Sequence, residues 1–257
     1  AHELAHAWFQ HLLATNEAKH PWMDEGFTEY ITHLAEESVI GNQSEFPHKS
    51  SYDRYYLLVN SGLEQPQTVH SDRYDYNFAY GASSYSKGSV FMAQLEYIIG
   101  KENMAKTIKR YYDEFKFKHP TPNDFKRVAE KVSDMELEWY LNDWTRTTNT
   151  VDYGLDISSL SDDRSISVKR KGGIPMPLEI EVSYDDGSSL LYYIPNDLMH
   201  GLKSFDAKNV IQMEAWGWAS PEYSFQDITD KKITKVEIDP SKTLADVNQI
   251  DNSFTIE

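Results

Sequence analysis

The spacing of apolar residues changes part way along the chain. From the first residue to about residue 150 they recur at helical intervals, as Val90, Leu95 and Ile98 do in "GSVFMAQLEYIIG". The segment from Met104 to Tyr112 continues in the same style. The first part of the chain is therefore predicted to be a series of helices.

Two helix starts are marked by capping residues. In "TPNDFKRVAEKV", Thr121 is placed as an N-cap, Pro122 at the first helical position and Asp124 at the third. Directly afterwards, Ser133 is followed three residues later by Glu136, which is the spacing of a capping box. The sequence thus predicts two helices almost end to end.

From about Val151 the period becomes two. In "PLEIEVSY" apolar and polar residues alternate, which predicts a strand with one buried and one solvated face. The turn "DDG" then leads into "SLLYYIP" and predicts a hairpin. "RSISVKRK" and "KITKVEIDP" add two strands, so we expect a small antiparallel β-sandwich over residues 153–257, joined to the helical part by "TRTTNTVDYGLD", a composition compatible with a linker.

Composition narrows the class of protein. A length of 257 residues, with 40% apolar and 13% aromatic residues, suffices for a sizeable core in one large or two modest domains. The net charge of −16 opposes binding to nucleic acids and anionic lipids. It mildly favours a cationic substrate such as a peptide with a free amino terminus, but acidity is more often only a solubility feature. Because cysteine is absent, disulfides, thiolate ligands and a cysteine nucleophile are excluded.

Targeting signals are not evident. No apolar run approaches the roughly 20 residues that span a bilayer, so no membrane-spanning segment is expected. No signal peptide is visible either. The compartment therefore stays open between periplasmic or secreted and cytoplasmic.

The first six residues contain a metal-binding pattern, H-E-x-x-H. On a helix, His2 and His6 lie on one face about 5–6 Å apart, so both imidazoles can bind one metal ion while Glu3 addresses a water on it. A catalytic zinc needs a third protein ligand. Glu25, in "WMDEGFTEY", follows His6 after eighteen residues, enough to turn the chain and start a second helix against the first.

These two segments resemble the zinc signature of the M1 family, the gluzincin metallopeptidases of the aminopeptidase N and leukotriene-hydrolase type. Both histidines, the glutamate, the spacing, Trp22 and the Glu-Gly pair match. Two departures, Gln10-His11 in place of Gly-Asn and Asp24 in place of Asn, touch no ligand. "SSYSKGSVFM" also matches the Tyr-x-Lys-Gly pattern of the family and places Tyr85 in it.

The resemblance implies an α+β multidomain protein. Residues 1–152 would form part of a thermolysin-like, mostly α-helical catalytic domain, and 153–257 the β-sandwich. It further implies one Zn²⁺ ion and the hydrolysis of N-terminal residues from peptides with a free amino terminus. The implied roles are metal binding by His2, His6 and Glu25, general base for Glu3, and oxyanion stabilisation for Tyr85.

Some parts of the family pattern are not found. The Gly-x-Met-Glu-Asn segment that holds the substrate's amine is absent; "QMEAW" around Met213 and Glu214 lacks its glycine and asparagine. The chain also has no room for the N-terminal β-rich domain of the family. We therefore expect a fragment that begins at the zinc helix, has its missing N-terminal domain as partner, and shows weak or no activity alone.

Two alternatives remain open at this stage. The segment could be a non-catalytic zinc-binding or scaffolding module of a larger chain, or the same site could serve an endopeptidase or epoxide hydrolase. Glu29, four residues after Glu25, either accepts a hydrogen bond from a ligand histidine or is a solvated surface glutamate. The remaining histidines lack partners at ligand spacing and are interpreted as ordinary structural or surface residues: His11, His20, His33, His48, His70, His119 and His200.

Overall fold

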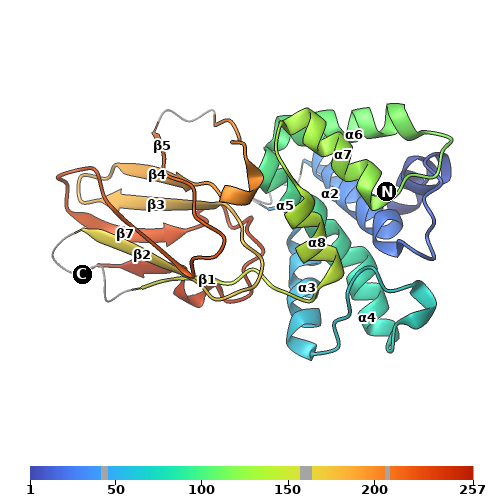
Figure 1. Cartoon of the computed structure of the whole chain (residues 1–257), viewed down its shortest axis with the longest axis horizontal. Helices are drawn as coiled ribbons and strands as arrows, with labels where there is room; N and C mark the ends of the chain where they lie inside the picture. The colour runs from blue at the N-terminus through green and yellow to red at the C-terminus, as the bar shows by residue number, and fades with distance from the viewer. Residues whose placement is uncertain (42–45, 157–163, 206–208, 257) are drawn as a thin grey trace. The chain divides into compact units, whose positions relative to one another are not determined.

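The computed structural model divides the chain into two compact units, Ala1–Thr148 and Asn149–Glu257. It describes residues 1–41, 46–156, 164–205 and 209–256. The first unit is helical and the second is built of strands (Figure 1). The predicted combination of helices with largely antiparallel sheets is therefore confirmed. Within the described residues, no helix has the length and apolar character needed to cross a membrane.

The first unit contains both α-helices and short π-helical turns. The α-helices are α1 His2–Ala5, α2 Phe27–Ile40, α3 Lys49–Ser61, α4 Asn77–Gly81, α5 Gly88–Ile99, α6 Lys101–Phe115, α7 Pro122–Ser133 and α8 Glu138–Arg146. The π-helical turns are η1 Ala7–Leu12, η2 Trp22–Gly26 and η4 Ala82–Lys87, and η3 Ser71–Arg73 is a 3₁₀ turn.

Helix α5 forms the centre of this unit. All of its residues except Glu96 are buried, as expected for a helix that is apolar on every side. It contacts α2, α3, α6 and the two π-helical turns η2 and η4. The ring of Phe91 on α5 lies 4.9 Å from Trp22 of η2 and 4.9 Å from Tyr140 of α8. These aromatic contacts hold η2 against the core.

The start of α7 is as predicted. Thr121 is the N-cap and Pro122 is the first helical residue. The backbone N–H of Thr121 donates to the Asp124 carboxylate at 2.8 Å, and its hydroxyl donates to the same oxygen at 2.7 Å. Both bonds are donated by Thr121, and they fix the Asp124 side chain against the start of the helix.

The second predicted cap is wrong. Ser133 is the last residue of α7 rather than the cap of the next helix, and its hydroxyl donates to the Ala129 carbonyl at 2.8 Å. Asp134 then adopts a left-handed conformation, with φ of 57°, which ends the helix. Helix α8 begins only at Glu138, so the serine back-bonds within its own helix instead of starting a new one.

The second unit holds two sheets. The strands are β1 Tyr153–Leu155, β2 Ser165–Arg170, β3 Leu178–Tyr184, β4 Ser189–Ile194, β5 Val210–Gln212, β6 Glu222–Gln226, β7 Ile233–Ile238 and β8 Ser253–Thr255. One sheet has the order β1-β2-β6 and the other β5-β4-β3-β7-β8. All pairs are antiparallel except β4 with β5, which is parallel and departs from the expected antiparallel pattern.

The predicted hairpin is present in β3 and β4. Ser183 pairs with Ser189 next to the turn, and Gly187 supplies the positive φ of 81° that the turn requires. The two sheets of the unit meet where the ring of Tyr192 on β4 lies 4.9 Å from that of Phe225 on β6. Both sheets therefore contribute to one core.

The segment "TRTTNTVDYGLD" is not an exposed linker. It contains the end of α8 and the whole of β1, and Val151, Tyr153 and Leu155 in it are buried. The two units join inside it, between Thr148 and Asn149. Its polar composition suggested a linker, but every second residue after Val151 packs into the sheet core.

Candidate metal centre

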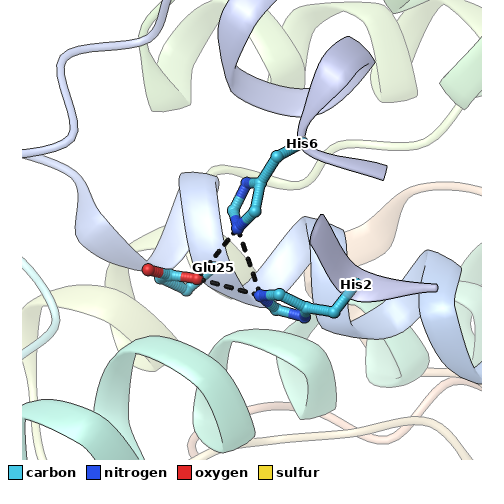
Figure 2. A group of neighbouring side chains, drawn as sticks. All are labelled: His2, His6 and Glu25. Atoms are coloured by element: carbon cyan, nitrogen blue, oxygen red, sulfur yellow. Dashed lines mark hydrogen bonds and ion pairs between the residues drawn. The ribbon is translucent and has the colours of Figure 1, made fainter. Parts of the chain in front are cut away.

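Three side chains of the first unit converge on one point. His2 lies on α1, His6 directly follows it, and Glu25 lies on η2. The Nε2 atoms of the two histidines are 3.1 Å apart, and Oε2 of Glu25 is 3.2 Å from that of His2 and 3.3 Å from that of His6 (Figure 2). Among the described residues this is the one group of three potential ligands close enough to share an ion.

Local geometry explains how the two halves of this group are formed. His2 and His6 are one helical turn apart and therefore lie on the same side of α1. The chain then reverses, and Pro21 leads into η2, where buried Trp22 fixes the turn against α5. Glu25 lies in a π-helical turn, a rare conformation that often occurs at functional sites.

The outer nitrogen of each histidine has oxygen partners. Nδ1 of His2 lies 2.9 Å from Oε2 of Glu29. Nδ1 of His6 lies 3.2 Å from the Thr28 hydroxyl and 3.0 Å from Oδ1 of Asp24. Because a carboxylate accepts hydrogen bonds, the contact with Glu29 favours a proton on Nδ1 of His2, which leaves its Nε2 lone pair facing inward.

This arrangement fits a bound cation. Two imidazole nitrogens and a carboxylate oxygen converge with 3.1–3.3 Å between them, close enough to share one cation. Two histidines and one carboxylate are a ligand set of catalytic zinc sites, which keep a fourth position for water. The donor set of His2, His6 and Glu25 therefore suits zinc.

Glu29 is ionised in this setting. A hydrogen bond from His33 is the largest cause that lowers its pKa, with further contributions from the charges of His33 and His2, against an opposing effect of burial. Oε1 of Glu29 lies 3.4 Å from Nε2 of His33. Of the two interpretations left open for Glu29, the structure favours the contact with a histidine of the cluster, because the carboxylate lies against His2.

Asp24 is a member of the cluster that the sequence did not identify as functional. It is buried, and burial raises the pKa of its carboxyl to about 7, with smaller contributions from Glu25 and Glu17. In the sequence it stood out only as a departure from a family pattern. Its contact with His6 could not be predicted from spacing, since both residues are brought together by the turn between α1 and η2.

Tyr85 lies beside the histidines. It is on η4, and its ring stacks on the imidazole of His2 at 5.5 Å between centroids, with 19° between the planes. Burial is the largest cause that raises the pKa of its phenol, followed by a hydrogen bond to Glu25. The hydroxyl therefore stays protonated at neutral pH and can donate a hydrogen bond.

The negative charges of the cluster also act on a second tyrosine, Tyr80. Burial raises the pKa of its phenol, and the charges of Glu25 and Asp24 raise it further. No signal in the sequence distinguishes Tyr80 among 17 tyrosines.

Glu3 has a different environment from the other predicted residues. It follows His2 on α1, and its side chain is exposed. In the part of the chain that the structure describes, Glu3 makes no hydrogen bond or ion pair with His2, His6 or Glu25. An exposed carboxylate next to the first histidine is accessible to solvent water.

Comparison with known proteins gives a family match over the same unit. The Peptidase family M1 domain model matches residues 1–144. Aminopeptidase M1-B of Oryza sativa subsp. japonica is 27% identical over 154 residues, which cover 57% of this chain and 17% of that protein. Glutamyl aminopeptidase of Sus scrofa is 26% identical over 176 residues, covering 66% and 18%. This chain thus matches less than a fifth of the length of both relatives.

A solved structure resembles nearly the whole chain. The crystal structure of Legionella pneumophila aminopeptidase A in complex with aspartic acid aligns with a TM-score of 0.55 and 16% identity, over 95% of this chain and 26% of that one. At this identity the likeness shows the fold alone. The fold similarity nevertheless extends beyond residues 1–144, where the family model matches.

Proposed function

This chain belongs to peptidase family M1, a family of zinc metallopeptidases, and on that premise we propose that it carries the zinc site of an aminopeptidase. The predicted family and enzyme class are thereby confirmed. The activity of the whole protein is our proposal, because the chain matches only 17% of the length of its rice relative. The relatives named above are aminopeptidases, which supports the choice of reaction.

The observation that carries the proposal is the convergence of His2, His6 and Glu25. Their inward-facing ligand atoms would hold one Zn²⁺ ion, while Glu29, Thr28 and Asp24 orient the two imidazoles from behind. When bound, zinc would supply a Lewis acid that lowers the pKa of water toward about 7.

Two residues of the chain would then act on the reacting groups, Glu3 by proton transfer and Tyr85 by hydrogen bonding. We assign Glu3 as the general base that takes the proton of the attacking water and later passes it to the leaving amine. Its exposed position on α1 gives it access to both. Tyr85, protonated at neutral pH, would donate a hydrogen bond to the oxygen that becomes negative as the peptide carbonyl is attacked.

We also propose how the two units relate to a complete enzyme. The unit Ala1–Thr148 would be part of a thermolysin-like catalytic domain, and Asn149–Glu257 the β-sandwich domain that follows it. The likeness to the Legionella aminopeptidase over 95% of this chain supports this assignment of the fold.

Zinc analysis combined with a peptidase assay tests the function. We expect the complete gene product to contain one zinc per chain and to hydrolyse aminoacyl p-nitroanilides. Glu3→Gln should abolish turnover and retain the metal. Tyr85→Phe should lower turnover about 10²–10³-fold with zinc content unchanged, since one oxyanion donor is lost. Exposed Glu36 and Tyr76 provide matched controls, as Glu36→Gln and Tyr76→Phe.

The same experiment separates the alternatives. Zinc without turnover of any substrate would favour a non-catalytic zinc-binding or scaffolding module. Cleavage of an internal bond in a peptide with a blocked amino terminus would favour an endopeptidase, and turnover of an epoxide without peptidase activity an epoxide hydrolase. A complete gene product without zinc would overturn the site itself.

A further inference from the structure

Two more histidines lie behind the cluster. His33 on α2 and His48 at the N-cap of α3 are 8% and 5% exposed. Nδ1 of His33 lies 3.2 Å from Nδ1 of His48, and Nε2 of His33 lies 3.4 Å from Oε1 of Glu29. The other oxygen of Glu29 lies 2.9 Å from Nδ1 of His2. One line of contacts therefore runs from His48 to His2.

We propose that His33 and His48 are positioning residues of the zinc site, which hold Glu29 against His2 through one directed chain of hydrogen bonds. The proposal rests on the function proposed above only for its consequence for zinc. The direction of the chain follows from the contacts of Glu29, which accepts hydrogen bonds from both sides. In the sequence both residues were interpreted as ordinary structural or surface histidines, and the proposal assigns them a positioning role.

The Glu29 carboxylate lies between His2 and His33 and determines which atoms donate the hydrogen bonds. An ionised carboxylate only accepts hydrogen bonds, so Nδ1 of His2 and Nε2 of His33 must both carry protons toward Glu29. With its proton on Nε2, His33 can accept a hydrogen bond at Nδ1. His48 must then donate from its own Nδ1 across the 3.2 Å contact. The Ser50 hydroxyl, 3.3 Å from Nε2 of His33, can share the same proton.

His48 is suited to the role of neutral donor. Burial lowers its pKa to about 3, aided by the charge of His33 and opposed by that of Glu29. It lies at the positive N-terminus of α3, where its carbonyl accepts the N–H groups of Ser51 at 3.0 Å and Tyr52 at 3.2 Å. Its imidazole is therefore uncharged at neutral pH.

The orientation of the His48 ring is fixed by an aromatic neighbour. The ring stacks on Tyr30 with 4.8 Å between centroids and 4° between the planes. The Tyr30 hydroxyl in turn donates to Glu96 of α5. Through these contacts the core helix holds His48 in place, and Nδ1 of His48 faces His33.

The consequence for metal binding is that the His2 imidazole becomes a more basic and better oriented ligand. A carboxylate fixed by two donors holds the His2 ring with its Nε2 lone pair toward His6 and Glu25. Partners that orient a metal-binding histidine change metal affinity by about 10–100-fold when removed. His33 acts one contact further out, so we expect its loss to weaken zinc binding by about tenfold, at the lower end of that range.

Zinc affinity of three variants tests this consequence. The dissociation constant is measured by competition with a chelator in the complete gene product. His33→Ala should weaken binding about tenfold, and His33→Gln should restore most of it, because its amide can still donate to Glu29. His48→Phe keeps the stack on Tyr30 but removes the donor, and should show an intermediate loss. His70→Asn, at a half-exposed histidine of the same unit, should change nothing.

A second measurement is independent of zinc. Nitrogen-15 spectra of the imidazoles in metal-free wild-type protein should show His33 protonated on Nε2 and His48 on Nδ1. The opposite tautomers would overturn the proposal. Failure of wild type to bind zinc, with the expected tautomers present, would overturn the proposed function and the consequence for zinc but leave the directed chain supported.

Two further outcomes would overturn the positioning role. One is equal zinc affinity in wild type, His33→Ala and His48→Phe. The other is equal loss in His33→Ala and His33→Gln, accompanied by equal loss of thermal stability in the metal-free state, which would mark a purely structural role. A second zinc per chain that disappears in His33→Ala would also overturn it, since the two nitrogens would then be ligands.

Discussion

Gly26 and Gly88 pack backbone against backbone. A Cβ atom on Gly26 would lie 2.5 Å from the Cα of Gly88, and one on Gly88 would lie 2.8 Å from the Cα of Gly26. Gly26 directly follows Glu25, and Gly88 is three residues after Tyr85. This contact therefore sets how closely the turn that carries the acidic side chain approaches the turn that carries the tyrosine.

Gly26→Ala is expected to destabilise the helical unit by about 1–3 kcal/mol or more, because the neighbouring atoms are backbone and cannot move aside. The measurement is the free energy of unfolding in urea. Gly81→Ala is the matched control: it is also a helical glycine, and its added Cβ would meet only the flexible Arg54 guanidinium at 3.4 Å. Equal stability of Gly26→Ala and wild type would contradict the close contact.

The lysine of the Tyr-x-Lys-Gly pattern forms a buried ion pair. Lys87 is fully buried, with Nζ 2.6 Å from Oε1 of Glu64, whose side chain is 7% exposed. Burial lowers the pKa of Lys87, and Glu64 opposes that shift. Lys87→Met should cost about 3–5 kcal/mol of unfolding free energy, since it leaves the Glu64 carboxylate buried without its partner.

A double variant separates the lost charge from lost packing. Lys87→Met combined with Glu64→Leu should recover part of the stability, because no charge is then left unpaired. The exposed pair of Lys106 and Glu102 is the control, and Lys106→Met should leave the urea midpoint unchanged. Additive losses in the double variant would show that the pair does not interact.

Zinc removal should loosen the helical unit selectively. A ligand that binds only the folded state adds about 4 kcal/mol at a free concentration 1,000 times its Kd. A chelator should therefore raise hydrogen exchange in residues 1–41 and leave the strands of the second unit unchanged. In His6→Ala the chelator should have no further effect. Equal exchange with and without chelator in wild type would argue against a zinc site at this position.

His48 should make the metal-free protein sensitive to acid. Burial lowers its pKa from 6.5 to about 3, so between these values the unfolded chain binds a proton that the folded chain does not. Stability is full above pH 6.5 and should fall toward pH 3, by about 1.4 kcal/mol per pH unit from this residue.

The variant His48→Phe should remove that part of the slope while retaining the stack on Tyr30. Unfolding in urea at several pH values between 4 and 7 measures it, with His70→Asn as the control for loss of a histidine. The same slope in His48→Phe and wild type would show that His48 binds its proton equally well in both states.

The predicted cap at Ser133 is wrong for a local reason. Ser133 and Glu136 have capping-box spacing, but the left-handed Asp134 ends α7 and leaves Glu136 outside a helix. The segment around Val151 joins the two units and also contains β1, which pairs with β2. The end of α7 is thus decided by neighbouring residues, whereas the β1–β2 pairing depends on residues further along the chain.

The amino-acid sequence by itself determined the family, the change from helices to strands, and the placing of His2 and His6 on one helical face. These features follow from spacing of a few residues, which helix and strand geometry convert directly into position. Only the tertiary structure decided the contacts of Asp24 with His6, of Tyr85 with His2, and of His33 with Glu29 and His48. Each depends on how separate helices pack, and no local periodicity encodes that.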